Sequence, residues 1–341
     1  MEKKAVITAH DLRIGYRTGK KEHVVHEQLN FELYAGELTC LLGANGAGKS
    51  TLLRTLSVSQ PALGGKLHLL NKPLWAFSEK ERSRTIGVVL TDKTYAGGLT
   101  VYELVGLGRQ PHTGFFGRLS KDDRRIIEEA MEHVGIAHKA KNYTAELSDG
   151  ERQKVMIAKA LVQECPLILL DEPTAFLDVV SRIEIMHLLH RLAEEQNKAI
   201  LLSTHDIEQA LVLADKLWLL SPENGLQTGV PEDLILNHQM DNLFPHQEIR
   251  FDYDHGVYYP NVKGERKISI EAEDKTLKHW VINALNRHGY QCLSTPQEGI
   301  PHLRALSPNN LQVCQGVQVR SYTSFESLLK SPLITTNTPL T

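Results

Sequence analysis

Long apolar runs are missing from this sequence of 341 residues. The longest reach about five residues, whereas a helix that crosses a bilayer needs about 20. The first residues also lack the apolar segment of a secretory signal. The sequence therefore predicts a cytosolic protein without a transmembrane helix, which reaches a membrane only through a partner.

Cysteines are also few, and basic residues are not in excess. The four cysteines show neither a disulfide framework nor a metal-binding spacing. Lysine and arginine number 38 against 41 aspartates and glutamates, which gives a net charge of −3. A nucleic-acid-binding surface needs a basic excess, so no nucleic acid partner is predicted. Hydrophobic residues make up 41% of the chain, enough for one large domain and a small one.

A glycine-rich segment gives the first chemical signal. Residues 43–50 read GANGAGKS, which fits the phosphate-binding pattern G-x-x-x-x-G-K-S. The apolar run 38–42 predicts a buried strand before the loop, and residues 51–56 have helical spacing after it. Glycines let the backbone approach phosphate, and amide groups at the helix N-terminus face the anion. Lys49 is expected to reach the β- and γ-phosphates and Ser50 to ligate Mg²⁺. The predicted nucleotide contacts in this segment are Gly43, Asn45, Gly46, Gly48, Lys49, Ser50 and Thr51.

Two further apolar runs end in polar side chains. Residues 166–170 predict a strand that ends in Asp171 and Glu172, and residues 199–204 predict a strand followed by His205. The carboxyl ends of parallel strands open on the ligand crevice of such sheets. Asp171 therefore fits Mg²⁺ binding, and Glu172 fits the polarisation of an attacking water; His205 fits a hydrogen bond to the γ-phosphate. The predicted catalytic residues are Lys49, Glu172 and His205.

The segment LSDGERQ at residues 147–153 stands directly before a run with helical periodicity, residues 153–161. Ser148 and Gly150 would present a small hydroxyl and bare backbone at a helix N-terminus, which is an anion-binding position. The side chain of Asp149 is expected to cap the same helix.

These motifs, in this order, resemble the ATP-binding subunit of ABC transporters over about residues 5–240. The resemblance implies an α/β fold of the P-loop NTPase class, with a RecA-like core and a helical subdomain at about residues 92–160. It also implies a homodimer that closes on ATP and Mg²⁺. In that dimer Ser148 and Gly150 of one copy face the nucleotide held by the P-loop of the other.

The same resemblance implies three further contacts. Asp178 belongs to the loop that follows the strand ending in Asp171, and Tyr16 matches the aromatic residue that stacks on adenine. The family usually has a Mg²⁺-contacting glutamine after the strand that corresponds to residues 86–90 here. Thr91 stands at that position, so Thr91 is a candidate Mg²⁺ ligand, with the adjacent Asp92 as the alternative oxygen donor. The departure concerns the coupling to a membrane subunit and not ATP binding.

Residues 99–114 resemble the corresponding stretch in importers of iron–siderophore, haem and cobalamin. The spacing of Thr100 and Glu103 predicts a capping box at a helix start, and the helix is expected to end near Gly108. The resemblance implies integral membrane permease subunits as partners, a substrate-binding protein acting indirectly, and a peripheral position at the cytoplasmic face of the inner membrane. Two alternatives stay open: a generic helical turn at this position, and a soluble single-cassette ATPase such as a component of an iron–sulfur assembly scaffold.

The chain continues for about 90 residues beyond the usual end of the importer ATPases near residue 250. We therefore expect an ATP-binding domain over residues 1–250 and an accessory domain over residues 251–341. In the accessory part, the sequence pattern predicts a hairpin at 251–260, a strand at 267–271 and a helix at 277–288 that stops at Gly289. A strand at 317–319 and a helix at 324–329 would complete a small α/β or α+β fold. No catalytic constellation is visible there, and both a dimer-stabilising role and a sensor role remain open.

Overall fold

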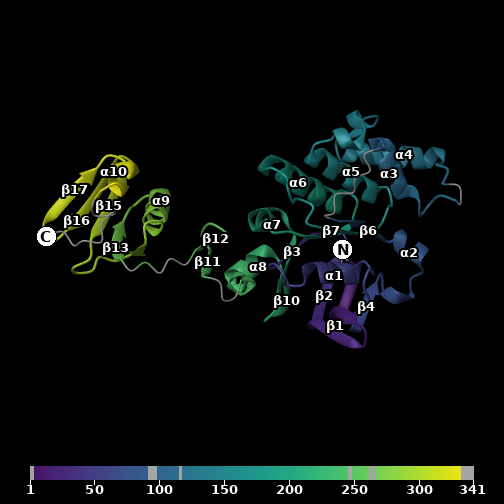
Figure 1. Cartoon of the computed structure of the whole chain (residues 1–341), viewed down its shortest axis with the longest axis horizontal. Coiled ribbons are helices and arrows are strands. Elements are labelled where there is room, and N and C mark those ends of the chain that lie inside the picture. The colour runs from purple at the N-terminus through teal and green to yellow at the C-terminus, as the bar shows by residue number, and fades with distance from the viewer. Residues whose placement is uncertain are drawn as a thin grey trace. The chain divides into compact units, whose positions relative to one another are not determined.

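The computed structural model describes residues 4–90, 98–114, 117–244, 248–260, 264 and 266–331. It divides into two compact units, the first made of residues 1–247 with 251–257 and the second of residues 248–250 with 258–341. Each unit has its own hydrophobic core, with two sheets in the first unit and a five-stranded sheet in the second. Figure 1 follows the chain from its purple N-terminal strands to its yellow C-terminal elements.

The first unit is built around a six-stranded sheet in the order β10-β9-β3-β8-β7-β6. All neighbouring strands are parallel except β9 and β10. The strands are β3 (Leu38–Leu42), β6 (Ile86–Val89), β7 (Leu167–Asp171), β8 (Ala199–Ser203), β9 (Lys216–Ser221) and β10 (Gly225–Gly229). Every residue of β3 and β8 is buried, as expected for parallel strands covered on both faces. The four strands predicted from apolar runs are thus confirmed, with small shifts at their ends.

A second, antiparallel sheet shares the core of this unit. Its order is β2-β1-β4-β5, with β1 (Ala5–Thr18), β2 (Lys21–Tyr34), β4 (Gly64–Leu69) and β5 (Lys72–Pro73). Phe31 on β2 meets Trp218 on β9 with ring centroids 4.5 Å apart. Leu41, just before the glycine-rich loop, and Leu52, on helix α1 (Lys49–Leu56) just after it, belong to the same buried core. The core therefore holds both ends of the loop.

The helical part of the first unit lies between β6 and β7 in the sequence. It contains α3 (Val101–Gly106), η2 (Leu107–Arg109), α4 (Lys121–His133), η3 (Ala137–Lys139), η4 (Thr144–Glu146) and α5 (Asp149–Leu161), and Figure 1 shows α3, α4 and α5 side by side. Thr100 caps α3 in a capping box with Glu103, so the predicted helix start is confirmed. No helix within the described ranges is long and apolar enough to cross a membrane.

The remaining helices of the first unit are short except one. They are η1 (Leu74–Ala76), α2 (Glu79–Ser83), α6 (Val179–Glu195), α7 (Ile207–Leu213), α8 (Pro231–Leu236) and η5 (Gln239–Leu243). α6 follows β7 and α7 follows β8, so each of these strands leads through a short turn into a helix, as in other parallel α/β sheets.

Arg109 ties the helical part together. Its guanidinium donates to the Asp123 carboxylate over 2.8 Å, to the Val162 carbonyl over 2.6 Å and to the Glu164 carboxylate over 2.6 Å. The hydroxyl and amide of Ser120, together with Arg109, lower the pKa of Asp123 to about 2. The side chains of Arg109 and Asp123 are only 6% and 11% exposed, so this pair is shielded from solvent, whereas Glu164 is 53% exposed.

Over its described residues, the second unit is an open sheet with two helices. The sheet order is β14-β13-β15-β16-β17, where β13 is parallel to both neighbours and the other pairs are antiparallel. The elements are β13 (Arg266–Glu271), α9 (Lys275–Asn286), β14 (Tyr290–Leu293), β15 (His302–Ser307), β16 (Asn310–Gln315), β17 (Gln318–Tyr322) and α10 (Phe325–Leu329). The short strands β11 (Ile249–Asp252) and β12 (Val257–Pro260) pair as a separate two-stranded sheet.

The predicted elements of the extension are confirmed, whereas β14, β15 and β16 were not anticipated. Gly289 has φ 75°, the left-handed conformation that ends a helix most readily when the residue is glycine. The core of the second unit joins one face of α9, through Val281 and Leu285, to sheet residues such as Leu303 and Leu311.

Candidate nucleotide site

The glycine-rich loop connects β3 to α1 and is shaped by its neighbours. Gly46 has φ 80° and Gly48 has φ 96°, conformations that residues with a side chain rarely adopt. A Cβ on Gly48 would stand 2.7 Å from a methyl group of Val25, and one on Gly43 would stand 2.5 Å from the Leu220 carbonyl oxygen. A Cβ on Gly46 would meet no atom within 4 Å, so this stretch of the loop faces open space. The loop therefore fits a bound phosphate chain on its open side.

Lys49 turns back over this loop. Its amine donates to the carbonyl of Gly43 over 2.7 Å and to that of Ala44 over 3.2 Å. Burial lowers the pKa of Lys49, while the negative charges of Glu172 and Asp171 oppose this shift. Ser50 follows at the start of α1 and is exposed. A cation and two carboxylates thus meet at the same edge of the sheet, as the strand-end pattern predicts.

The acidic strand end is held by a serine that the sequence did not single out. The Ser203 hydroxyl, at the end of β8, donates to the Asp171 carboxylate over 2.6 Å and accepts from the Glu172 amide over 3.0 Å. Glu172 has φ 48°, an unusual conformation for a residue with a side chain. His205 Nε2 lies 2.6 Å from the Glu172 carboxylate. Because β7 and β8 are neighbours, the two predicted catalytic groups meet directly.

His26 is a second contributor that sequence reasoning missed. Its Nε2 lies 2.7 Å from the Ala47 carbonyl, and its ring stands beside Gly48. The residue is buried on β2, 21 positions before Ala47, the loop residue it contacts. Nothing local marks it, because the contact depends on how the antiparallel sheet packs beside α1.

Two other residues that were predicted to contact the nucleotide are exposed to solvent. Tyr16 lies on β1, is 51% exposed and stacks on His23, with ring centroids 5.1 Å apart and planes 16° from parallel. Asn45 is exposed in the loop. Thr91 lies outside the described residues.

The segment 147–153 forms the start of α5 with one correction to the prediction. Ser148, not Asp149, caps the helix: its hydroxyl accepts from the Glu151 amide over 3.2 Å, and the Glu151 carboxylate accepts from the Ser148 amide over 2.9 Å. Asp149 is the first residue of the helix itself, and its carboxylate pairs with Arg152 at 2.7 Å. The expectation that Asp149 caps α5 was wrong because a cap needs the extended backbone that Ser148 has.

Gly150 and Asp178 meet around one serine of α6. The Asp178 carboxylate caps α6 by accepting from the Ser181 amide over 2.9 Å. A Cβ on Gly150 would stand 3.1 Å from the Ser181 hydroxyl. Ser148 and Gly150 are thus supported by α5 and α6, whereas Lys49, Glu172 and His205 gather at the strand ends.

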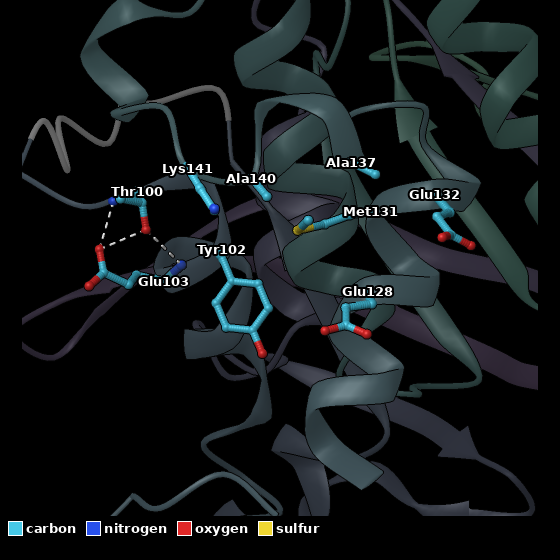
Figure 2. A pocket seen from close by; sticks show the side chains of 9 residues that line it. All are labelled: Thr100, Tyr102, Glu103, Glu128, Met131, Glu132, Ala137, Ala140 and Lys141. Atoms are coloured by element: carbon cyan, nitrogen blue, oxygen red, sulfur yellow. Dashed lines mark hydrogen bonds between the residues drawn. The ribbon is translucent and has the colours of Figure 1, made fainter. Parts of the chain in front are cut away.

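A pocket of about 600 Å³ lies apart from these residues, in the helical part beside α3 and α4 (Figure 2). Its charged lining residues are Glu103, Glu128, Glu132 and Lys141, so carboxylates outnumber amines. Figure 2 shows the Tyr102 ring and the side chains of Glu128 and Met131 around it. Burial and the Glu128 charge raise the pKa of Tyr102, while Arg124 opposes this shift.

Comparison with known proteins agrees with this arrangement. Residues 26–175 match the ABC transporter family. The chain is 41% identical over 238 residues to the iron(3+)-hydroxamate import ATP-binding protein FhuC of Bacillus subtilis (strain 168), covering 70% of this chain and 87% of that protein.

Two solved structures share the fold. The inward-facing structure of a metal-chelate type ABC transporter has 28% sequence identity and a TM-score of 0.62, covering 75% of this chain and 96% of that one. A dimeric ATP-binding cassette in a post-hydrolysis state, bound to ADP and Pi, has 26% identity and a TM-score of 0.57, covering 66% of this chain and 98% of that one.

The chain belongs to the ABC transporter family, as an ATP-binding subunit. It is an ATPase of the ATP-binding cassette type that powers transport, and its fold is that of the P-loop NTPases. The family resemblance, the fold class and ATP binding predicted from the sequence are confirmed.

Proposed function

We propose that this protein hydrolyses ATP to drive the import of a metal chelate, namely an iron–siderophore, haem or cobalamin. The observation that supports this cargo most directly is the match to an iron(3+)-hydroxamate import subunit over 238 residues. The likeness to a metal-chelate type transporter points to the same class. In this proposal two copies sit beneath integral permease subunits at the cytoplasmic face of the inner membrane, and a substrate-binding protein delivers the chelate from outside.

The roles of the site residues follow from their positions. Lys49 and His205 donate to the phosphates, and Glu172 orients the attacking water. Asp171 and Ser50 supply oxygen ligands for Mg²⁺, whose charge would stabilise the phosphate oxygens, and Thr91 is proposed as a further ligand. Tyr16 stacks on adenine. Ser148, Gly150 and Asp178 act on the nucleotide bound by the other copy.

The acidic pocket beside α3 and α4 is proposed as the contact for the permease. Glu128 and Glu132 attract a basic segment, while the Tyr102 ring offers apolar surface for a short amphipathic helix. The accessory domain, proposed over residues 251–341, braces the dimer of the ATP-binding domains over residues 1–250.

An uptake experiment in a strain that lacks this chain tests the cargo. Uptake of a radiolabelled ferric hydroxamate, haem and cobalamin is measured one by one, with the wild-type chain and Glu172→Gln supplied from a plasmid. We expect the strain that lacks the chain to lose uptake of one of the three chelates. The wild-type chain should restore this uptake, and Glu172→Gln should not. Normal uptake of all three, combined with loss of iron–sulfur enzyme activity, would contradict the importer and support the assembly-scaffold alternative.

A further inference from the structure

The second unit carries a cavity that the ATPase does not use. It lies beside α9 and has a volume of about 620 Å³. Pockets for small organic ligands range over about 300–1,000 Å³ and are lined mainly by apolar side chains with a few polar groups. The lining here includes Trp280, Leu306, Pro308 and Phe325 as apolar residues and Asp274 and Arg287 as charged ones.

The cavity is built on one face of α9. Leu277, Trp280, Ala284 and Arg287 follow one another at intervals of three or four residues, so their side chains point the same way. Leu277 and Ala284 are buried and form its floor, whereas Trp280 is 59% exposed. Leu306, at the end of β15, also lines the cavity and is 57% exposed. Two large apolar side chains therefore border the same hollow, which is a common mark of a binding site.

The charges in this lining are separated along the helix. Asp274 caps the N-terminus of α9 and accepts from the Leu277 amide over 2.6 Å, so its carboxylate is engaged. Arg287 stands at the other end of the helix, about 20 Å away for thirteen residue steps at 1.5 Å each. Within the part of the chain that the structure describes, Arg287 makes no ion pair. The cavity thus has an apolar body and a positive end.

We propose that this cavity binds a flat, amphipathic organic anion, such as an aromatic carboxylate or sulfonate. The apolar rings lie against Trp280, Leu306 and Phe325, where a planar body gains the most contact area. The anionic group pairs with Arg287, whose guanidinium can form two parallel hydrogen bonds to one acidic group. The site lies entirely within the second unit, and it does not depend on the import function proposed above.

Two related dyes test the proposal on the full-length protein. 1-Anilinonaphthalene-8-sulfonate has flat rings and one sulfonate, and N-phenyl-1-naphthylamine has the same rings without the sulfonate. Saturating ATP with Mg²⁺ keeps the dyes out of the nucleotide site. We expect one molecule of the sulfonate dye to bind per chain and to receive excitation energy from Trp280. Trp280→Ala should abolish this energy transfer and most of the binding.

The charge is tested by a matched pair of variants. Arg287→Gln should weaken binding of the sulfonate dye about tenfold and leave the uncharged dye unaffected, because only the ionic hydrogen bonds are lost. Arg320→Gln on β17 removes the same charge outside the cavity and should change neither affinity. Leu306→Ser, at an exposed position, should weaken both dyes by a similar factor.

Three outcomes would overturn the proposal. Equal effects of Arg287→Gln and Arg320→Gln would mean that the dye responds only to net charge. Equal loss of both dyes in Arg287→Gln would mean that this residue shapes the cavity without pairing with an anion. A shift from dimer to monomer in dye-free Trp280→Ala, seen by sedimentation velocity, would show that this surface joins two chains. Thermal unfolding of each variant confirms that its second unit is folded.

Discussion

At the carboxyl ends of β7 and β8 in the first unit, the candidate site residues bond to one another, whereas the cavity of the second unit is bordered by partly exposed side chains. Ser203 holds the Asp171 carboxylate and the Glu172 amide, and His205 meets Glu172. In the second unit Trp280 is more than half exposed. The first arrangement is fixed before a ligand arrives, which favours catalysis of one reaction by positioned charges. The second is adaptable, which favours binding of a class of ligands by shape and one charge.

The largest effect expected concerns the fixed edge. Glu172→Gln keeps the size of the side chain and removes its charge, so ATP still binds but hydrolysis should fall by about a hundredfold or more. Steady-state phosphate release and ATP affinity are measured side by side. Glu184→Gln, on the surface of α6, is the matched control and should keep normal turnover. Hydrolysis close to the wild-type rate in Glu172→Gln would remove this residue from the mechanism.

The second prediction tests whether the fixed edge is completed by another copy. Lys49→Ala disables the P-loop, and Ser148→Arg blocks the segment at the start of α5. Each variant alone should be nearly inactive, while mixing them should restore about a quarter of wild-type activity, because half of the dimers then carry one intact site. Phosphate release is followed against the mixing ratio. If no mixing ratio restores activity although cross-linking demonstrates heterodimers, the shared site is contradicted.

The third prediction separates the two units physically. A chain of residues 1–250 should bind ATP but hydrolyse it several-fold more slowly in dilute solution, and high protein concentration should restore the rate by mass action. ATPase assays over a range of concentrations compare it with the full chain. A reduced maximal rate at every concentration would instead assign a regulatory role to the second unit. Insoluble protein would show that the boundary is misplaced.

The fourth prediction concerns the Arg109 network. Because the folded pKa of Asp123 is lowered to about 2, its carboxylate stabilises the fold above about pH 4, and this contribution disappears as the pH falls toward 2. Asp123→Asn should therefore lower the free energy of unfolding by about 2 kcal/mol at pH 7 and by much less near pH 2. Urea unfolding at the two pH values checks this. An equal loss at both values would mean that packing, not charge, is responsible.

The smallest effects distinguish the two neighbours at the start of α5. Ser148→Ala removes the cap and should cost about 1 kcal/mol of stability, whereas Asp149→Ala should cost less than about 0.5 kcal/mol because its ion pair with Arg152 is exposed. Thermal unfolding of the two variants gives the comparison. A larger loss of stability from Asp149→Ala than from Ser148→Ala would mean that Asp149, and not Ser148, caps the helix.

The sequence predicted the contiguous features and missed those made by distant segments. The strand, loop and helix around Lys49 follow from a local pattern of apolar runs and glycines, and so do the acids after β7. Ser203 and His26 could not be found in this way, since each acts on a segment far away in the chain. The choice between Ser148 and Asp149 as cap depended on one backbone angle, which composition does not determine.

The second unit shows the same limit more strongly. Helix α9 was visible through its period and its terminal glycine, but β15 and β16 were not predicted. The cavity combines α9 with Leu306 and Phe325, which are nearly 20 residues apart and lie on different elements. No local pattern could have indicated that these side chains share one hollow.

The contact between Gly108 and α5 has a mechanical consequence. A Cβ on Gly108 would stand 2.2 Å from the Lys159 carbonyl oxygen, so the turn after α3 lies directly against α5, and the adjacent Arg109 fastens the same two segments and α4 by hydrogen bonds. The three helices α3, α4 and α5 should therefore move as one rigid body. A force applied to the surface near Tyr102 would displace Ser148, at the start of α5, by rotating this whole body and not by bending it.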